Sequence, residues 1–263
     1  MDVMDTGPIA PAVPLPQVTA GSIIGRTFAV WGQNAVAFSL VMLFLYLPVL
    51  VAQLWLGPAP VVTAPHVSPS VMLRYPTLAL GIGLLSGVLA LVSTGALTRG
   101  VLQSLDGRRP AAAELLGFGF RKFWPVLVTS LDVGLRVMLW TLLLIVPGIM
   151  ASCRLAVSVP ARVAEPNLRS SEAVARSRRL TLGRRNALFL SMVVFWVVVS
   201  VVNAAVGVAS RRGVLPFVAA TALAWAVTAI GNGLFPTAAG VAYHDLRVEK
   251  EGADTSQLAR IFE

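Results

Sequence analysis

Three charged residues, Asp132, Arg136 and Arg154, lie within otherwise apolar stretches of this sequence. Asp132 and Arg136 are four positions apart, which places them on one face of a helix. Arg154 comes six positions after the second residue of a Pro-Gly pair, Pro147 and Gly148. Counting about 1.5 Å per residue from the start of the first helix puts Arg136 roughly 20 Å deep. If the chain turns at the Pro-Gly pair, Arg154 reaches a comparable depth on the adjacent helix. We therefore predict a buried charge cluster of one carboxylate and two guanidinium groups.

Two main interpretations of this cluster are open. A charge within a span costs about 2.5–3.5 kcal/mol on insertion scales, so it usually faces protein or a water-filled cavity. In the first interpretation the cluster is a structural lock that fixes the register of two spans. In the second, the surplus positive charge receives an anion such as a lipid phosphate, because guanidinium groups match phosphate oxygens. A proton or ion pathway is a third interpretation, but transporters usually have more intramembrane polar residues.

The composition identifies the class of protein. Hydrophobic residues make up 56% of the 263 residues, charged residues 13%, and the mean hydropathy is +0.78. Globular proteins contain about 25% charged residues. Ala35 to Leu56 and Ala187 to Val208 contain no charged residue or histidine, and each is long enough to cross a hydrocarbon core of about 30 Å. We predict an all-α, polytopic membrane helix bundle.

Six transmembrane helices are expected. Their ranges are 35–56, 77–97, 123–146, 149–163, 187–208 and 214–242. The fourth depends on the turn at Pro147 and Gly148 and is short, so it needs little tilt or locally thinned lipid. The domain organisation predicted is a disordered, Pro-rich N-terminal tail (1–20), a membrane domain (21–245) and a cytoplasmic C-terminal tail (246–263).

The distribution of basic residues predicts the orientation. Six spans put most of the 21 basic residues on the side of the two termini, as the positive-inside rule requires of the cytoplasmic face. The opposite face keeps Arg74, Arg211 and Arg212. Five spans would leave the basic group after residue 161 outside. Both termini are therefore expected in the cytoplasm, with the protein in a bacterial inner membrane. Orientation also explains the net charge of +9 without a nucleic-acid partner.

Three basic, partly apolar stretches precede the outward-going spans. They run from Gly21 to Asn34, from Ala111 to Trp124 and from Ser170 to Asn186. Such stretches are typical of amphipathic helices that lie in the headgroup plane. In the third, five arginines are predicted to contact anionic lipid head groups: Arg176, Arg178, Arg179, Arg184 and Arg185.

Residues for catalysis or metal binding are few. His66 and His244 have no second histidine or cysteine nearby in the sequence, so neither suggests a metal site. The single cysteine, Cys153, is expected to be a small packing residue. We expect no enzymatic activity, no metal and no cofactor.

The stretch VPGIMASCRLAVSVPARVAEPNLRSSEAVARSRRLTLGRRNALFL resembles a known family. This is an uncharacterised family of bacterial six-helix integral membrane proteins, related to the membrane domain of glycerophosphoryl diester phosphodiesterases. The matching residues are Pro147, Gly148, Ile149, Arg154, Pro160, Glu165, Ser171, Glu172, Ala173, Arg176, Ser177, Thr181, Gly183 and Arg184. The resemblance implies a fold and a location. It implies no activity, because the soluble phosphodiesterase domain is absent from this sequence.

Two functions are therefore considered. The first is a non-enzymatic integral inner-membrane protein, acting as a lipid-interacting structural protein or as a subunit of a larger membrane assembly. The alternative is a small transporter or lipid-handling protein with an anion-binding pocket at Arg136 and Arg154, lined also by Asn232. The expected partners are anionic membrane lipids, together with a partner subunit or further copies of the chain.

Overall fold

The computed structural model describes residues 17–56, 69–212, 214 and 216–252. All regular secondary structure in these ranges is helical, which confirms the all-α class for this part of the chain. The predictions for residues 1–16 and 253–263 lie outside the described residues. The helices are α1 (Ala20–Gln33), α2 (Ala35–Leu56), α3 (Pro69–Leu105), α4 (Ala112–Arg121), α5 (Phe123–Leu143), α6 (Ile145–Leu155), α7 (Ser158–Ala164), α8 (Ser170–Leu180), α9 (Arg185–Arg211) and α10 (Phe217–Glu251).

Five of the described helices are long and apolar enough to cross a membrane: α2, α3 from Pro76 onward, α5, α9 and α10. Their outward faces are strongly apolar. On α2, large exposed side chains recur every three or four residues, at Leu40, Phe44, Leu47, Val51 and Trp55. This spacing follows one face of a helix. Exposed apolar surface of this extent is unusual for a protein in water and is typical of a surface that faces lipid.

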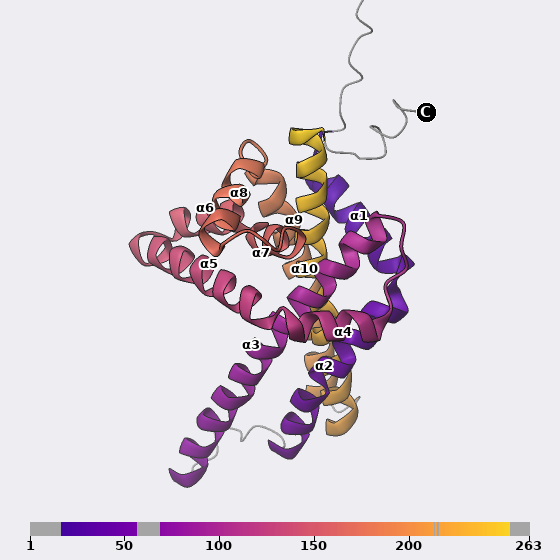
Figure 1. Cartoon of the computed structure of the whole chain (residues 1–263). Coiled ribbons are helices and arrows are strands. Elements are labelled where there is room, and N and C mark those ends of the chain that lie inside the picture. Colours follow the sequence, from indigo (N-terminus) through magenta and orange to yellow (C-terminus); the bar gives the residue numbers. More distant parts are fainter. Residues whose placement is uncertain (1–16, 57–68, 213, 215, 253–263) are drawn as a thin grey trace, which may run out of the picture.

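The core of the bundle lies between α2, α3 and α10, which run alongside one another (Figure 1). Phe38 of α2, Leu97 of α3 and Tyr243 of α10 are fully buried there. Gly240 lets α10 approach α3 closely, since a Cβ atom at this position would lie 3.2 Å from a Val101 methyl group. The bundle therefore holds its long helices together by close apolar packing.

The two ends of the described chain meet at one end of this bundle. Thr19 and Ser22 form a capping box at the start of α1. The backbone N–H of Val18 donates to Glu249 Oε2 at 3.1 Å, and Arg26 of α1 forms an ion pair with Asp245 of α10. The predicted tail boundaries therefore need correction. Residues 17–20 pack on the bundle, and α10 continues beyond residue 245 to Glu251, where Gly252 ends it with φ of 60°.

The segment predicted as the fourth span is not one helix. Residues 149–163 are divided between α6 and α7, with a break at Ala156 and Val157. At about 1.5 Å per residue, the 11 residues of α6 extend about 16 Å, roughly half of the hydrocarbon thickness. Val157, Ser158 and Ala161 are completely buried within the protein. The prediction of a continuous span over 149–163 is therefore wrong.

The turn between α5 and α6 also differs from its predicted position. The helices are separated at Leu144, which is extended with φ of −161° and ψ of 143°, three residues before Pro147. Pro147 lies instead in the first turn of α6, where the missing N–H has no partner to lose. Gly148 lies where the two helices touch, since a Cβ atom there would be 2.7 Å from the Thr141 Cα. The Pro-Gly pair starts and packs α6, and Leu144 makes the turn.

Candidate functional site

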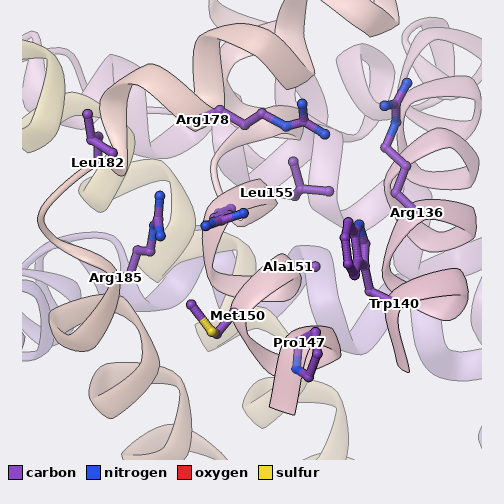
Figure 2. A pocket seen from close by; sticks show the side chains of 10 residues that line it. Arg136, Trp140, Pro147, Met150, Ala151, Leu155, Arg178, Leu182 and Arg185 are labelled. Atoms are coloured by element: carbon purple, nitrogen blue, oxygen red, sulfur yellow. The ribbon is translucent and has the colours of Figure 1, made fainter. Parts of the chain in front are cut away.

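A cavity of about 530 Å³ lies between α5, α6, α8 and the start of α9 (Figure 2). This volume falls within the range of about 300–1,000 Å³ typical of ligand pockets. We call the cavity the arginine pocket. Its lining residues are Arg136, Trp140, Pro147, Met150, Ala151, Arg154, Leu155, Arg178, Leu182 and Arg185.

The arginine pocket has a large surplus of positive charge. Four of its lining residues are arginines, and none is acidic. The Nε atoms of Arg154 and Arg185 are buried and have no hydrogen-bond partner. Figure 2 shows the side chain of Arg178 extending along one rim toward Arg136, with Arg185 on another wall. Because each guanidinium group has five N–H donors and no acceptor, the pocket offers donors that the protein itself does not satisfy.

The predicted charge cluster is present only in part. Arg136 Nε donates to Asp132 Oδ1 at 2.7 Å, and Ser170 Oγ donates to Asp132 Oδ2 at 3.0 Å. Within the described contacts, Arg154 shares the pocket with Arg136 but is not bonded to Asp132. The carboxylate is occupied by a residue of its own helix and by the start of α8. The prediction was therefore right about the pairing along α5 and wrong about the bond across the hairpin.

Arg154 is held in place through its backbone. Its carbonyl oxygen accepts hydrogen bonds from Ser177 Oγ at 2.8 Å and from Thr181 Oγ1 at 3.2 Å. Carbonyl groups in the last turn of a helix have no partner within that helix, so α6 uses the buried hydroxyl groups of α8 instead. These two bonds fix the end of α6 against α8 and leave the Arg154 side chain free to line the pocket.

Arg136 was predicted to lie about 20 Å from the start of α5, but the cavity that it lines does not lie at the middle of the long helices. Arg185, which lines the same cavity, is the first residue of α9. The cavity therefore lies level with the end of a long apolar helix and not half-way along it. The geometry follows from α5, which leaves the bundle sideways, across the direction of α3 and α10 (Figure 1).

The five arginines predicted to contact lipid head groups have different surroundings. Arg178 and Arg185 line the arginine pocket, and Arg179 is exposed. Arg184 is instead bound within the protein, with Nη2 2.6 Å from Glu249 Oε1. Arg176 is bound as well, as described next. Arg184 and Arg176 therefore have carboxylate partners within the protein, and the lipid contact of the five arginines stays a prediction.

Arg176 lies in a network of acidic groups. Its Nε donates to Glu165 Oε1 at 2.5 Å and its Nη1 to Glu251 Oε1 at 2.8 Å. The hydroxyl of Tyr243 also donates to Glu165 Oε1, at 2.6 Å. Burial lowers the pKa of Arg176, but hydrogen bonds to Glu251 and Tyr243 and the charge of Glu165 raise it more, so the net pKa is above its usual range. This network joins α8 to the end of α10.

Sequence reasoning missed these acidic partners. Glu249 is 65 positions from Arg184, and Glu251 is 75 positions from Arg176. The only signal in the sequence is the acidic character of the segment VEKEG, beside basic residues. That signal does not say which arginine each carboxylate binds.

The pocket proposed for a transporter is assembled only in part, because Arg136 and Arg154 line the arginine pocket and Asn232 does not. Asn232 lines a separate cavity of about 190 Å³ between α2, α3 and α10, together with Tyr46, Gln53 and Ser86. Arg136 and Arg154 do not contribute to that cavity. Elsewhere, no group of three or more His, Cys, Asp or Glu side chains within the described ranges is arranged to hold a metal ion.

Comparison of the chain with models of protein families, with curated proteins and with solved structures gave no match. The resemblance to the six-helix membrane family stays a prediction. The arginine pocket itself, with four guanidinium groups in its wall, is suited to binding an anion with several acceptor oxygens.

Proposed function

We propose that this chain is a non-enzymatic integral protein of a bacterial inner membrane, and that its arginine pocket binds the phosphate group of an anionic lipid. The observation that carries the proposal is the meeting of four arginines from four helices in one cavity without a lining carboxylate. Like charges that share one cavity repel one another. A folded chain keeps them together at lower cost when an anion is present, and phosphate matches the geometry of guanidinium donors.

The structural-lock interpretation of the charges is less well supported. A lock requires a charged bond between two spans, whereas the Asp132 to Arg136 pair lies within α5 alone. Arg154, the residue on the facing helix, is fixed through its carbonyl oxygen, and its Nε atom has no partner. The guanidinium group of Arg154 is therefore available to a ligand.

We also propose a topology in which α2, α3, α9 and α10 cross the membrane and the α5–α6 hairpin enters and leaves from the cytoplasmic side. The short α6 supports this arrangement, because 11 residues do not span the hydrocarbon core. Residues 142–146 at the hairpin tip are apolar, with 64–83% of their surface exposed, as suits a tip buried in lipid. An even number of crossings keeps both termini on the cytoplasmic side.

The test is the lipid content of purified protein. Wild type and the variants Arg154→Gln and Arg185→Gln are extracted in mild detergent, and the retained lipids are quantified by mass spectrometry. A hydrogen bond to a charged group contributes about 1.5–3 kcal/mol. Each variant is therefore expected to bind anionic phospholipid with an affinity lower by roughly tenfold or more. The matched control is Arg179→Gln, which removes an exposed arginine outside the pocket, so that any loss of a general surface attraction for anionic lipid is measured in the control as well.

Circular dichroism and size-exclusion chromatography show whether each variant is folded. Retention of equal amounts of anionic lipid by folded Arg154→Gln, folded Arg185→Gln and the control would contradict the proposal. Loss of lipid by the pocket variants alone supports it. Co-purification of another protein would identify a membrane assembly of which this chain is a subunit, and the lipid would then be bound within that assembly.

A further inference from the structure

We propose that the lipid bound in the arginine pocket carries a terminal phosphate monoester, and that its hydrocarbon chains leave along the apolar side of the α5–α6 hairpin. This inference rests on the proposed function and adds the chemical class of the ligand. It depends on two independent features of the cavity, its charge and the separation of its basic and apolar walls.

The positive charge of the pocket exceeds the single negative charge of a phosphodiester. Arg136, Arg154, Arg178 and Arg185 contribute four positive charges, and within the described part of the chain Asp132, behind Arg136, is the one carboxylate bonded to them. A phosphodiester carries one negative charge. A phosphate monoester carries about −1.5 to −2 at pH 7 and presents three terminal oxygens. The monoester therefore matches the surplus of charge and of unsatisfied N–H donors better than a diester does.

The same wall charges disfavour zwitterionic head groups. An ethanolamine or choline group would place a cation among four guanidinium groups. No acidic side chain lines the cavity to accept that cation, and like charges in a partly desolvated site repel strongly. A phosphate without a head-group substituent, or with a small neutral one, avoids this repulsion.

The apolar end of the cavity indicates that the phosphate is attached to hydrocarbon chains. In Figure 2 the guanidinium groups of Arg136 and Arg178 lie at one end of the cavity, and Pro147 and Met150 lie at the other. Trp140 lies between these ends, on the α5 wall, and 48% of its surface is exposed. Beyond Pro147 the wall continues into the exposed apolar tip, residues 142–146. A basic end and an apolar end fit an amphiphile, whereas free phosphate would leave the apolar wall without a partner.

The experiment is a binding titration of the full-length chain in detergent, followed by native mass spectrometry. The probes are phosphatidic acid, phosphatidylglycerol and phosphatidylethanolamine with identical acyl chains. At pH 7.5 we expect phosphatidic acid to bind roughly tenfold more tightly than phosphatidylglycerol, and phosphatidylethanolamine to bind more weakly than both. Inorganic phosphate at millimolar concentration is expected to leave the bound phosphatidic acid in place.

The pH dependence provides a second readout. The monoester loses its second proton with a pKa of about 6, so the preference over phosphatidylglycerol is expected to fall at pH 5.5. The charged groups that face the site are the arginines of α5, α6, α8 and α9 and the neighbouring Asp132. Guanidinium groups keep their charge throughout this range, so the change reports the ligand.

The matched variants are Arg178→Gln, which alters the pocket, and Arg179→Gln, which alters the next residue of α8 outside the pocket. Weaker binding of phosphatidic acid by Arg178→Gln alone supports the inference. Equal affinities for phosphatidic acid and phosphatidylglycerol, both reduced by Arg178→Gln, would overturn the preference for a phosphate monoester while leaving the proposed function intact. Displacement of the lipid by inorganic phosphate would overturn the inference that hydrocarbon chains bind along the apolar wall. Identical binding by the two variants would overturn the proposed function as well.

Discussion

Asp132 has a specific influence on the charge of the arginine pocket. Its carboxylate binds Arg136 at 2.7 Å and also accepts a hydrogen bond from Ser170. The bond occupies the Nε–H of one guanidinium group of the cavity wall and neutralises part of its charge. Arg154 and Arg185, in contrast, have buried Nε atoms without partners. At the scale of single residues, the pocket is a set of cations of which only one is neutralised by the protein.

Replacement of Asp132 by asparagine is therefore expected to strengthen anion binding. The variant keeps the acceptor oxygen for Ser170 but removes the charge beside Arg136, so retention of anionic lipid should rise about fivefold, equivalent to about 1 kcal/mol. Native mass spectrometry of the lipid-bound fraction measures the effect. The control is Glu114→Gln, a carboxylate on α4 that contacts Gln103 away from the cavity. Weaker binding by folded Asp132→Asn would show that the anion site depends on the Asp132 charge and would contradict this interpretation.

At the scale of elements, the α5–α6 hairpin shapes the site. Leu144 separates the helices, and Gly148 lets them touch at Thr141. The short α6 ends at Leu155, beside α8. There the hydroxyl groups of Ser177 and Thr181 donate to the carbonyl oxygen of Arg154 and fix the end of α6. Arg136 on α5 and Arg154 on α6 thereby line one cavity with Arg185 at the start of α9.

The close contact at Gly148 makes a prediction about stability. In Gly148→Ala the added Cβ atom would overlap Thr141 Oγ1 and lie 2.7 Å from the Thr141 Cα, so the helices must separate. Overpacking of this kind costs about 1–3 kcal/mol, and the apparent melting temperature in detergent should fall by roughly 5 °C. Gly134→Ala, on α5 with open space around its Cβ position, should leave the melting temperature unchanged. Equal effects of the two substitutions would refute the packing role of Gly148.

The proposed re-entrant hairpin makes a prediction about accessibility. In a Cys153→Ala background, Leu144→Cys is expected to resist a membrane-impermeant maleimide added to intact spheroplasts, because the tip lies in lipid. Arg212→Cys, at the far end of α9, should be labelled, and Arg179→Cys should be labelled only after the membrane is permeabilised. Labelling of Leu144→Cys as strong as that of Arg212→Cys would favour a hairpin that crosses the membrane completely.

At the scale of the whole molecule, ion pairs join elements that are far apart in sequence. Glu249 of α10 accepts hydrogen bonds from Arg184, which precedes α9, and from the N–H of Val18, which precedes α1. Arg26 of α1 binds Asp245 close by. One end of α10 is therefore the meeting point of the first helix, the α8–α9 turn and the last helix.

The charge of Glu249 is accordingly expected to stabilise the whole bundle. Glu249 is largely buried, with 15% of its side chain exposed. Its two oxygens accept from Arg184 and from Val18 N–H, and glutamine keeps only one acceptor oxygen and no charge, so one of these buried donors loses its partner. In Glu249→Gln the apparent melting temperature should fall by several degrees. The difference in melting temperature between the variant and wild type should be smaller in high salt, because screening weakens the ion pair of the wild type. Asp106→Asn, which alters an exposed carboxylate at the end of α3, is the control. A melting temperature of Glu249→Gln equal to that of the control would contradict the role of this pair.

The amino-acid sequence by itself determined the helical class and the long apolar elements. In lipid every backbone amide must find its partner within the segment, so a long uncharged run forms a helix whatever its neighbours do. The predicted range 35–56 coincides with α2, and 123–146 exceeds α5 by three residues. The pairing of Asp132 with Arg136 was also predictable, because it depends only on the spacing along one helix.

The tertiary structure alone decided where the turn lies, how far α6 extends and which arginines remain free. Leu144, and not the Pro-Gly pair, separates α5 from α6, because Pro147 is compatible with a first helical turn and Gly148 serves packing. Arg176 and Arg184 bind carboxylates of α10, whereas Arg178 and Arg185 line a cavity. Neighbouring arginines are equivalent in sequence, and only the positions of distant helices determine which of them meet a carboxylate and which are left for an anion.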